Sequence, residues 1–135
     1  MLNVHDMKKA FLMPLLATLI FCGCQQSMEE RAANEARTYT QKNCPLQLSE
    51  QIVMDSMTFD AASHTFGYHY RMTGSLDNDS AIDKPFMRQQ LGDALRNLTS
   101  LQAYKDEGYS FRYVYRSATH PDHILLEELF TREDY

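Results

Sequence analysis

Two neighbouring stretches of the chain alternate between apolar and polar residues, the pattern of strands with one buried face. Between residues 51 and 59, the alternation places Val53, Met57 and Phe59 on one face. Between residues 65 and 73, one face carries the apolar residues at even positions, Phe66, Tyr68, Tyr70 and Met72. Residues 60–64 form a short polar connection, so the pattern predicts a β-hairpin.

The last third of the chain shows the same alternation. One face of its first stretch carries Tyr109, Phe111, Tyr113 and Tyr115. After a turn at residues 119–122, a further strand is predicted over residues 124–131. These two segments predict a second hairpin.

Helical spacing is evident in two other segments. Ser27 and Glu30 have the spacing of a capping box, and residues 28–42 are rich in helix formers. Asp83 can cap a second helix that ends near Gly108. Its apolar residues recur every three or four positions, at Met87, Leu91, Leu95, Leu98 and Leu101.

The order helix, hairpin, helix, hairpin predicts an α+β fold. We expect a two-layer sandwich in which helices cover one face of a four-stranded antiparallel sheet, in the order α-β-β-α-β-β. The apolar faces of the strands would bury against Leu91, Leu95 and Leu98.

The first residues have the layout of a secretory signal. Lys8 and Lys9 precede an apolar run from Ala10 to Cys22. The run to Cys24 covers only about 22 Å as a helix, against a hydrocarbon core of about 30 Å, so a membrane-spanning helix is the weaker interpretation. Ordinary signal peptidase could cut the chain after this run, or the run could stay attached as an uncleaved anchor; both are alternatives to the attachment of lipid to Cys24.

The end of this run, Phe21-Cys22-Gly23-Cys24, resembles the lipobox of bacterial lipoproteins. Phe21 and Cys22 stand where that family usually has Leu and a small residue. The resemblance implies cleavage before Cys24, diacylglyceryl modification of its thiol and a further N-terminal acyl chain. Because Gln25 rather than Asp follows, it also implies a cell-envelope location at the outer membrane more than the inner one.

The predicted organisation therefore has three parts. Residues 1–23 form a signal peptide, and residues 24–48 form a lipidated N-terminus, a polar helix and a connector. Residues 49–135 form the α+β domain, on which the N-terminal helix could pack. The mature chain would hold 11 basic and 17 acidic side chains, a formal charge of −6, which disfavours nucleic acid as a partner.

The remaining chemistry-bearing residues are few. Cys44 is the one cysteine left after cleavage and lipidation, and it could pack as a small apolar residue or act as a thiol. His120 and His123 flank a Pro-Asp turn and could bind a metal with His69 or water, but the turn favours solvated side chains. A Cys44–His69 nucleophilic pair is a further alternative. We expect no cofactor and no metal.

Tyr68, Tyr70, Tyr113 and Tyr115 are the candidate binding surface, although core packing with the hydroxyls at the rim is the commoner arrangement. The phrase Asn43-Cys44-Pro45 and the two Tyr-x-Tyr strands resemble small uncharacterised envelope lipoproteins. We therefore expect a non-catalytic, membrane-anchored envelope protein with an envelope protein or a glycan as its partner. A small thiol- or metal-dependent enzyme and an inhibitor of a secreted enzyme are the alternatives.

Overall fold

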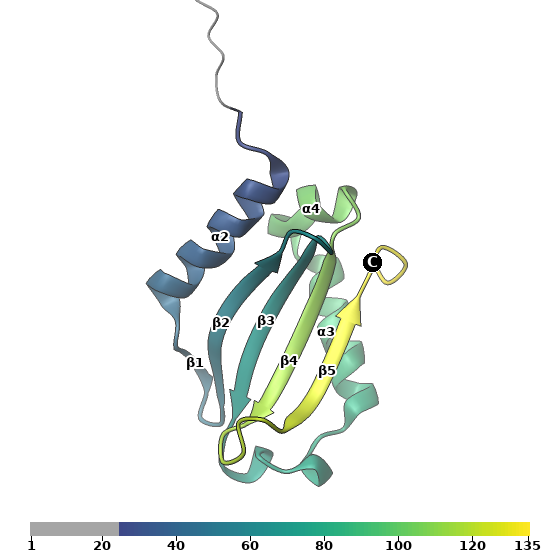
Figure 1. The fold of residues 1–135 in the computed structure, drawn as a ribbon. Helices are drawn as coiled ribbons and strands as arrows, with labels where there is room; N and C mark the ends of the chain where they lie inside the picture. The colour runs from purple at the N-terminus through teal and green to yellow at the C-terminus, as the bar shows by residue number, and fades with distance from the viewer. Residues whose placement is uncertain (1–24) are drawn as a thin grey trace, which may run out of the picture.

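The computed structural model describes residues 25–135 (Figure 1). The predicted signal peptide and Cys24 lie outside the described residues. Between residues 25 and 135, no helix is long and apolar enough to cross a membrane. The main elements are α2 (Met28–Asn43), β1 (Leu46–Ser49), β2 (Ile52–Asp60), β3 (Thr65–Met72), α3 (Lys84–Asn97), α4 (Gln102–Asp106), β4 (Ser110–Ser117) and β5 (Ile124–Phe130).

Both long helices begin where the sequence predicts. The Ser27 side chain accepts a hydrogen bond from the backbone of Glu30, whose carboxylate accepts one from Ser27 in return, so the capping box is confirmed. The Asp83 side chain accepts from the backbone N–H of Phe86 at the start of α3. The second helix is shorter than predicted, because a 3₁₀ turn at Thr99–Leu101 separates α3 from α4.

The strands form one five-stranded mixed sheet in the order β1-β2-β3-β4-β5, so the prediction of a four-stranded antiparallel sheet is wrong. The observed element order is α-β-β-β-α-β-β. β1 has only four residues and is mostly exposed, so it lacks a buried alternating face. β3 and β4 are parallel because the chain leaves the end of β3, crosses behind the sheet through α3 and α4, and enters β4 at the opposite end (Figure 1).

The core lies between the sheet and the helices. α3 and α4 lie on the far side of the sheet in Figure 1, and the near side carries no helix. The centre of the core is formed by the fully buried Phe66, Phe111, Leu95 and Tyr104. Ala32 of α2 belongs to the same cluster, so α2 packs on the same face of the sheet as α3 and α4.

α2 also protects the edge of the sheet. Beyond the short β1, the outer edge of β2 has no neighbouring strand. There the Thr40 hydroxyl accepts a hydrogen bond from the backbone N–H of Met57 and donates one to its carbonyl, both at 2.8 Å. Thr40 therefore takes the place of a neighbouring strand at Met57. Because unpaired strand edges promote association between molecules, this contact protects the edge of β2.

Candidate functional site

The predicted tyrosine surface lies at the centre of the helix-covered face. β3 and β4 are parallel and in register, so Tyr68 lies beside Tyr113 and Tyr70 beside Tyr115. The rings of the first pair stack at 5.0 Å between centroids and those of the second at 4.5 Å. Four tyrosines from two separate hairpins therefore form one stacked cluster.

Burial divides these four residues. Tyr113 and Tyr115 are buried, whereas Tyr68 and Tyr70 are half-buried. Tyr113 and Tyr115 therefore belong to the core and do not lie on an open platform, and the Tyr113 ring packs edge-on against Phe130 of the neighbouring strand β5. Contact of Tyr68 and Tyr70 with a partner remains a prediction.

Desolvation keeps the tyrosines protonated. Burial raises the pKa of Tyr113 and Tyr115 to about 12. Burial also raises the pKa of Tyr68 and Tyr70 well above the usual range, with neighbouring phenols adding to the rise. At neutral pH these hydroxyls can donate and accept hydrogen bonds but do not supply an anionic nucleophile or a base.

Beside the tyrosines, one flank of α2 borders a groove of about 620 Å³, which we call the α2 groove. Within α2, the side chains of this flank are spaced three or four positions apart, so they line one side of the helix. The groove is lined by Arg31, Glu35, Tyr39 and Lys42 of α2 and by Met57 of β2, among others.

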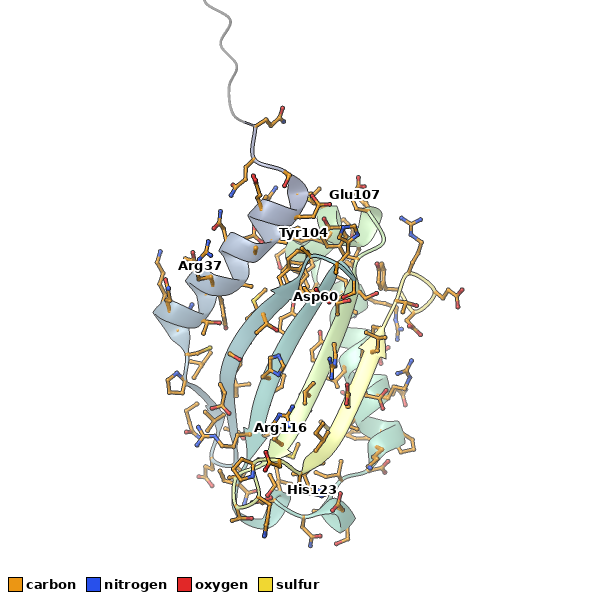
Figure 2. All side chains as sticks on the ribbon, in the orientation of Figure 1. Arg37, Asp60, Tyr104, Glu107, Arg116 and His123 are labelled. Carbon is orange, nitrogen blue, oxygen red and sulfur yellow. The ribbon has the colours of Figure 1, made fainter. Side chains whose placement is uncertain are left out.

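Contacts place this groove next to the tyrosine cluster. Met57 is opposite Tyr68 in the β2–β3 register, so both side chains lie on the same face of the sheet. Tyr39 lies close enough to contribute, after burial, to the raised pKa of Tyr68 and Tyr70. The Arg31 guanidinium, which lines the groove, lies 5.8 Å from the centre of the Tyr104 ring of α4 (Figure 2).

The opposite wall of this face is the apolar flank of α3. Gly92 packs against Phe130, so this side of α3 is directed toward β5. Helical rotation of 100° per residue then directs Met87 and Leu91 toward the middle of the sheet, where both are half-buried against the core. Leu98, the C-cap residue of α3, is seven positions after Leu91, which at 100° per residue places it on the same flank, and it is 45% exposed.

The structure also places the residues of the enzymatic alternatives. Cys44 caps the C-terminus of α2, and burial raises the pKa of its thiol, with Asp55 adding to the rise. The thiolate that catalysis requires is therefore disfavoured. His69 does not bond to Cys44; its Nε2 lies 3.0 Å from the Thr58 hydroxyl.

His120 and His123 lie in the β4–β5 loop and bond to different residues. His123 Nε2 is 2.7 Å from Asp79, and His120 Nδ1 is 3.1 Å from the Thr119 hydroxyl. Among residues 25–135, no group of three or more His, Cys, Asp or Glu side chains is placed to hold a metal ion.

Sequence reasoning missed the groove-lining residues of α2. Arg31, Glu35, Tyr39 and Lys42 do have helical spacing, which is the signal that could have identified them. Ala32 and Ala36, the apolar residues of the same helix, indicate only its buried side. The contribution of Met57 depends on which edge of β2 faces α2, and the local pattern carries no information about that edge.

Comparison with known proteins gives a family and a fold. The family model described as Domain of unknown function (DUF8479) matches residues 27–126, so the chain belongs to this family. No curated protein sequence matches the chain.

Three solved structures are similar in fold. One is a candidate secreted protein from Pseudomonas aeruginosa, with a TM-score of 0.64 and 15% identity, covering 80% of this chain and 96% of its own. The type II secretion system pilotin AspS from Vibrio cholerae has a TM-score of 0.59 and 18% identity, with coverage of 79% and 91%. The type II secretion pilotin EpsS from Vibrio vulnificus has a TM-score of 0.62 and 12% identity, with coverage of 78% and 89%.

Proposed function

We propose that this member of the DUF8479 family is a non-catalytic, lipid-anchored protein of the cell envelope that binds a helical segment of another envelope protein in the α2 groove. The observation that carries the proposal is the fold, which is shared over about four fifths of this chain with two type II secretion pilotins. We propose a secretin as the class of partner.

The dimensions of the helix-covered face suit a partner helix between α2 and α3. α2 lies outside β2 and α3 lies behind the β5 side of the sheet (Figure 1). Four strand spacings of about 4.8 Å separate the β1 position from β5, about 19 Å in total. Two helix–helix contact distances of about 8–10 Å fill the same width. A partner helix can therefore lie over Tyr68 and Tyr70 with α2 on one side and α3 on the other.

The two walls would orient such a helix. The α3 wall is apolar, through Met87, Leu91 and Leu98, and the α2 wall is polar. An amphipathic helix can bury its apolar stripe on α3 and the tyrosine rings while its polar side meets Arg31 and Lys42. The half-buried tyrosine hydroxyls supply hydrogen bonds to the same ligand.

The anchor that we propose at Cys24 would hold this groove near the bilayer. Cys24 precedes the first residue of α2 by only four positions, which limits the tether to about 14 Å when fully extended. The N-terminal end of α2 would then lie at the membrane surface. A short tether favours capture of a partner that is itself bound for that membrane.

Site-specific photocrosslinking in intact cells tests this proposal. A photoreactive residue at position 39 lies in the groove, whereas one at position 37 lies on the opposite side of α2, where Figure 2 shows Arg37 directed away from the sheet. We expect position 39 of the full-length protein to crosslink to one envelope protein, identified by mass spectrometry, and position 37 to give no such adduct. Equal crosslinking at both positions would contradict the proposal.

A pair of substitutions on α3 provides the matched comparison. Leu98 and Phe86 are both exposed, at 45% and 56%, but the helical spacing places only Leu98 on the flank of α3 that carries Met87 and Leu91. We expect Leu98→Asp to reduce recovery of the crosslinked partner by about tenfold or more and Phe86→Asp to leave it unchanged. The reverse order would place the partner elsewhere.

A further inference from the structure

The helix-free face of the sheet contains a second cavity, of about 550 Å³, which we call the outer hollow. Alternate residues of a strand point to opposite faces, so Gly67 and His69 of β3 lie on the face opposite Tyr68 and Tyr70. The outer hollow is therefore separate from the α2 groove. It is formed chiefly by Thr58, Gly67, His69, Arg112, Glu127 and Leu129, from four adjacent strands.

The floor of the outer hollow requires a residue without a side chain. A Cβ atom at Gly67 would lie 2.4 Å from the Thr58 hydroxyl and 2.8 Å from His69 Nε2, both too close for a real contact. Because Gly67 leaves this space, Thr58 and His69 can bond across the strand at 3.0 Å. The hydrogen bond fixes the imidazole over the floor. Its Nδ1 has no hydrogen-bond partner among residues 25–135 and is free to meet a ligand.

The opposite wall is also fixed in position. Arg112 Nε donates to Glu127 Oε1 at 2.6 Å, and its second contact reaches the same oxygen at 2.5 Å. The other Glu127 oxygen and part of the guanidinium remain available, with side chains 39% and 45% exposed. Next to this pair, Leu129 is 47% exposed and offers an apolar surface. Hydrogen-bond donors and acceptors of Thr58, His69, Arg112 and Glu127 thus lie around the apolar side chain of Leu129.

Charge excludes several ligand classes from the outer hollow. The charge of Arg112 is neutralised by Glu127. Burial lowers the pKa of His69, and the positive charges of Arg116 and Arg112 lower it further, so the neutral ring is favoured. At the upper end, Asp60 uses its two oxygens on Ala62 and Ser63 of its own loop (Figure 2). The lining therefore offers no unpaired cation for an anion and no free carboxylate pair for a cation.

We propose that the outer hollow binds an uncharged oligosaccharide. Vicinal hydroxyls match the paired donors and acceptors of Thr58, His69 and the Arg112–Glu127 pair, and the C–H face of a sugar ring matches Leu129. The volume lies within the usual range for small-ligand sites, about 300–1,000 Å³. This site is independent of the α2 groove, so a glycan and a protein partner can be held on opposite faces of one anchored domain.

The test is an NMR titration of the protein as purified from cells, in phosphocholine micelles, with three probes of equal length. These probes are chitotetraose, which is neutral, its fully deacetylated cationic form, and tetragalacturonate, which is anionic. A panel of other neutral tetrasaccharides follows. We expect a neutral member to give saturable shifts at the amides of Gly67 and His69, without shifts at Tyr39. The absence of saturable shifts with every neutral member, or stronger binding of either charged probe, would overturn the proposal.

Two conservative variants assign the binding to the outer hollow. Thr58→Val replaces the hydroxyl with a methyl group and keeps the shape of the side chain. Glu127→Gln removes the negative charge that pairs with Arg112. Each should weaken binding of the neutral probe about tenfold, as expected for the loss of one polar contact. Glu50→Gln, an exposed change in the turn between β1 and β2, is the matched control and should have no effect. Unchanged affinity in both hollow variants, with native-like spectra, would overturn the assignment.

Discussion

His69 has a titration that can be predicted in sign. Burial lowers its pKa, Arg116 and Arg112 lower it further, and Asp55 opposes them. Because the folded state disfavours the imidazolium, His69 leaves the unfolding free energy unchanged above its ordinary pKa of 6.5, lowers it as the pH falls from 6.5 through the lower folded pKa, and has no further effect below that. NMR titration should place the His69 midpoint below 6.5, and His69→Gln should flatten the pH dependence of unfolding between pH 7 and pH 5. A midpoint at or above 6.5 would contradict the environment described.

Lys105 is a buried charge with a structural task. Its side chain is only 5% exposed, and its ammonium donates to the carbonyls of Leu95 at 2.9 Å and Arg96 at 3.3 Å. These carbonyls belong to the last turn of α3, where a cation is also favoured by the helix dipole. We expect Lys105→Met to destabilise the fold by about 1.5–3 kcal/mol, measured by urea unfolding. Lys84→Met, an exposed change at the first residue of α3, should change stability by less than about 0.5 kcal/mol.

At the scale of elements, α2 forms one wall of the α2 groove and also covers the edge of β2 through the hydrogen bonds of Thr40. Thr40→Val keeps the shape of the side chain but leaves the N–H and carbonyl of Met57 without their 2.8 Å partners. We expect a loss of about 1–3 kcal/mol in unfolding free energy and a greater tendency to aggregate, because the strand edge is opened. Thr38→Val, an exposed change on the same helix, is the control. Equal stability of the two variants would show that the edge contact contributes nothing.

The sequence predicts those elements whose information is local. The caps at Ser27 and Asp83 and the alternation of Phe66, Tyr68, Tyr70 and Met72 each depend on residues a few positions apart, and all are observed. The parallel pairing of β3 with β4 depends instead on the path of a connection of more than thirty residues. β1 is defined only by its partner β2. The outer hollow likewise requires residues of four strands, and only within β3 (Gly67, His69) and within β5 (Glu127, Leu129) are its main residues close in sequence.

At the scale of the whole molecule, the proposed anchor at residue 24 and the free thiol at residue 44 provide a matched pair of cysteines. Cys24→Ala should abolish the lipid-dependent increase in mass, because the thiol that would carry the lipid is removed. Cys44→Ala should retain both the lipid and the membrane location, since Cys44 is a half-buried residue at the C-terminal cap of α2. Mass spectrometry of the full-length protein from fractionated cells measures both outcomes. A natural protein whose mass shows no lipid, or a lipid mass that persists in the Cys24→Ala protein, would exclude lipidation of Cys24 and would leave the groove without its proposed position at the bilayer.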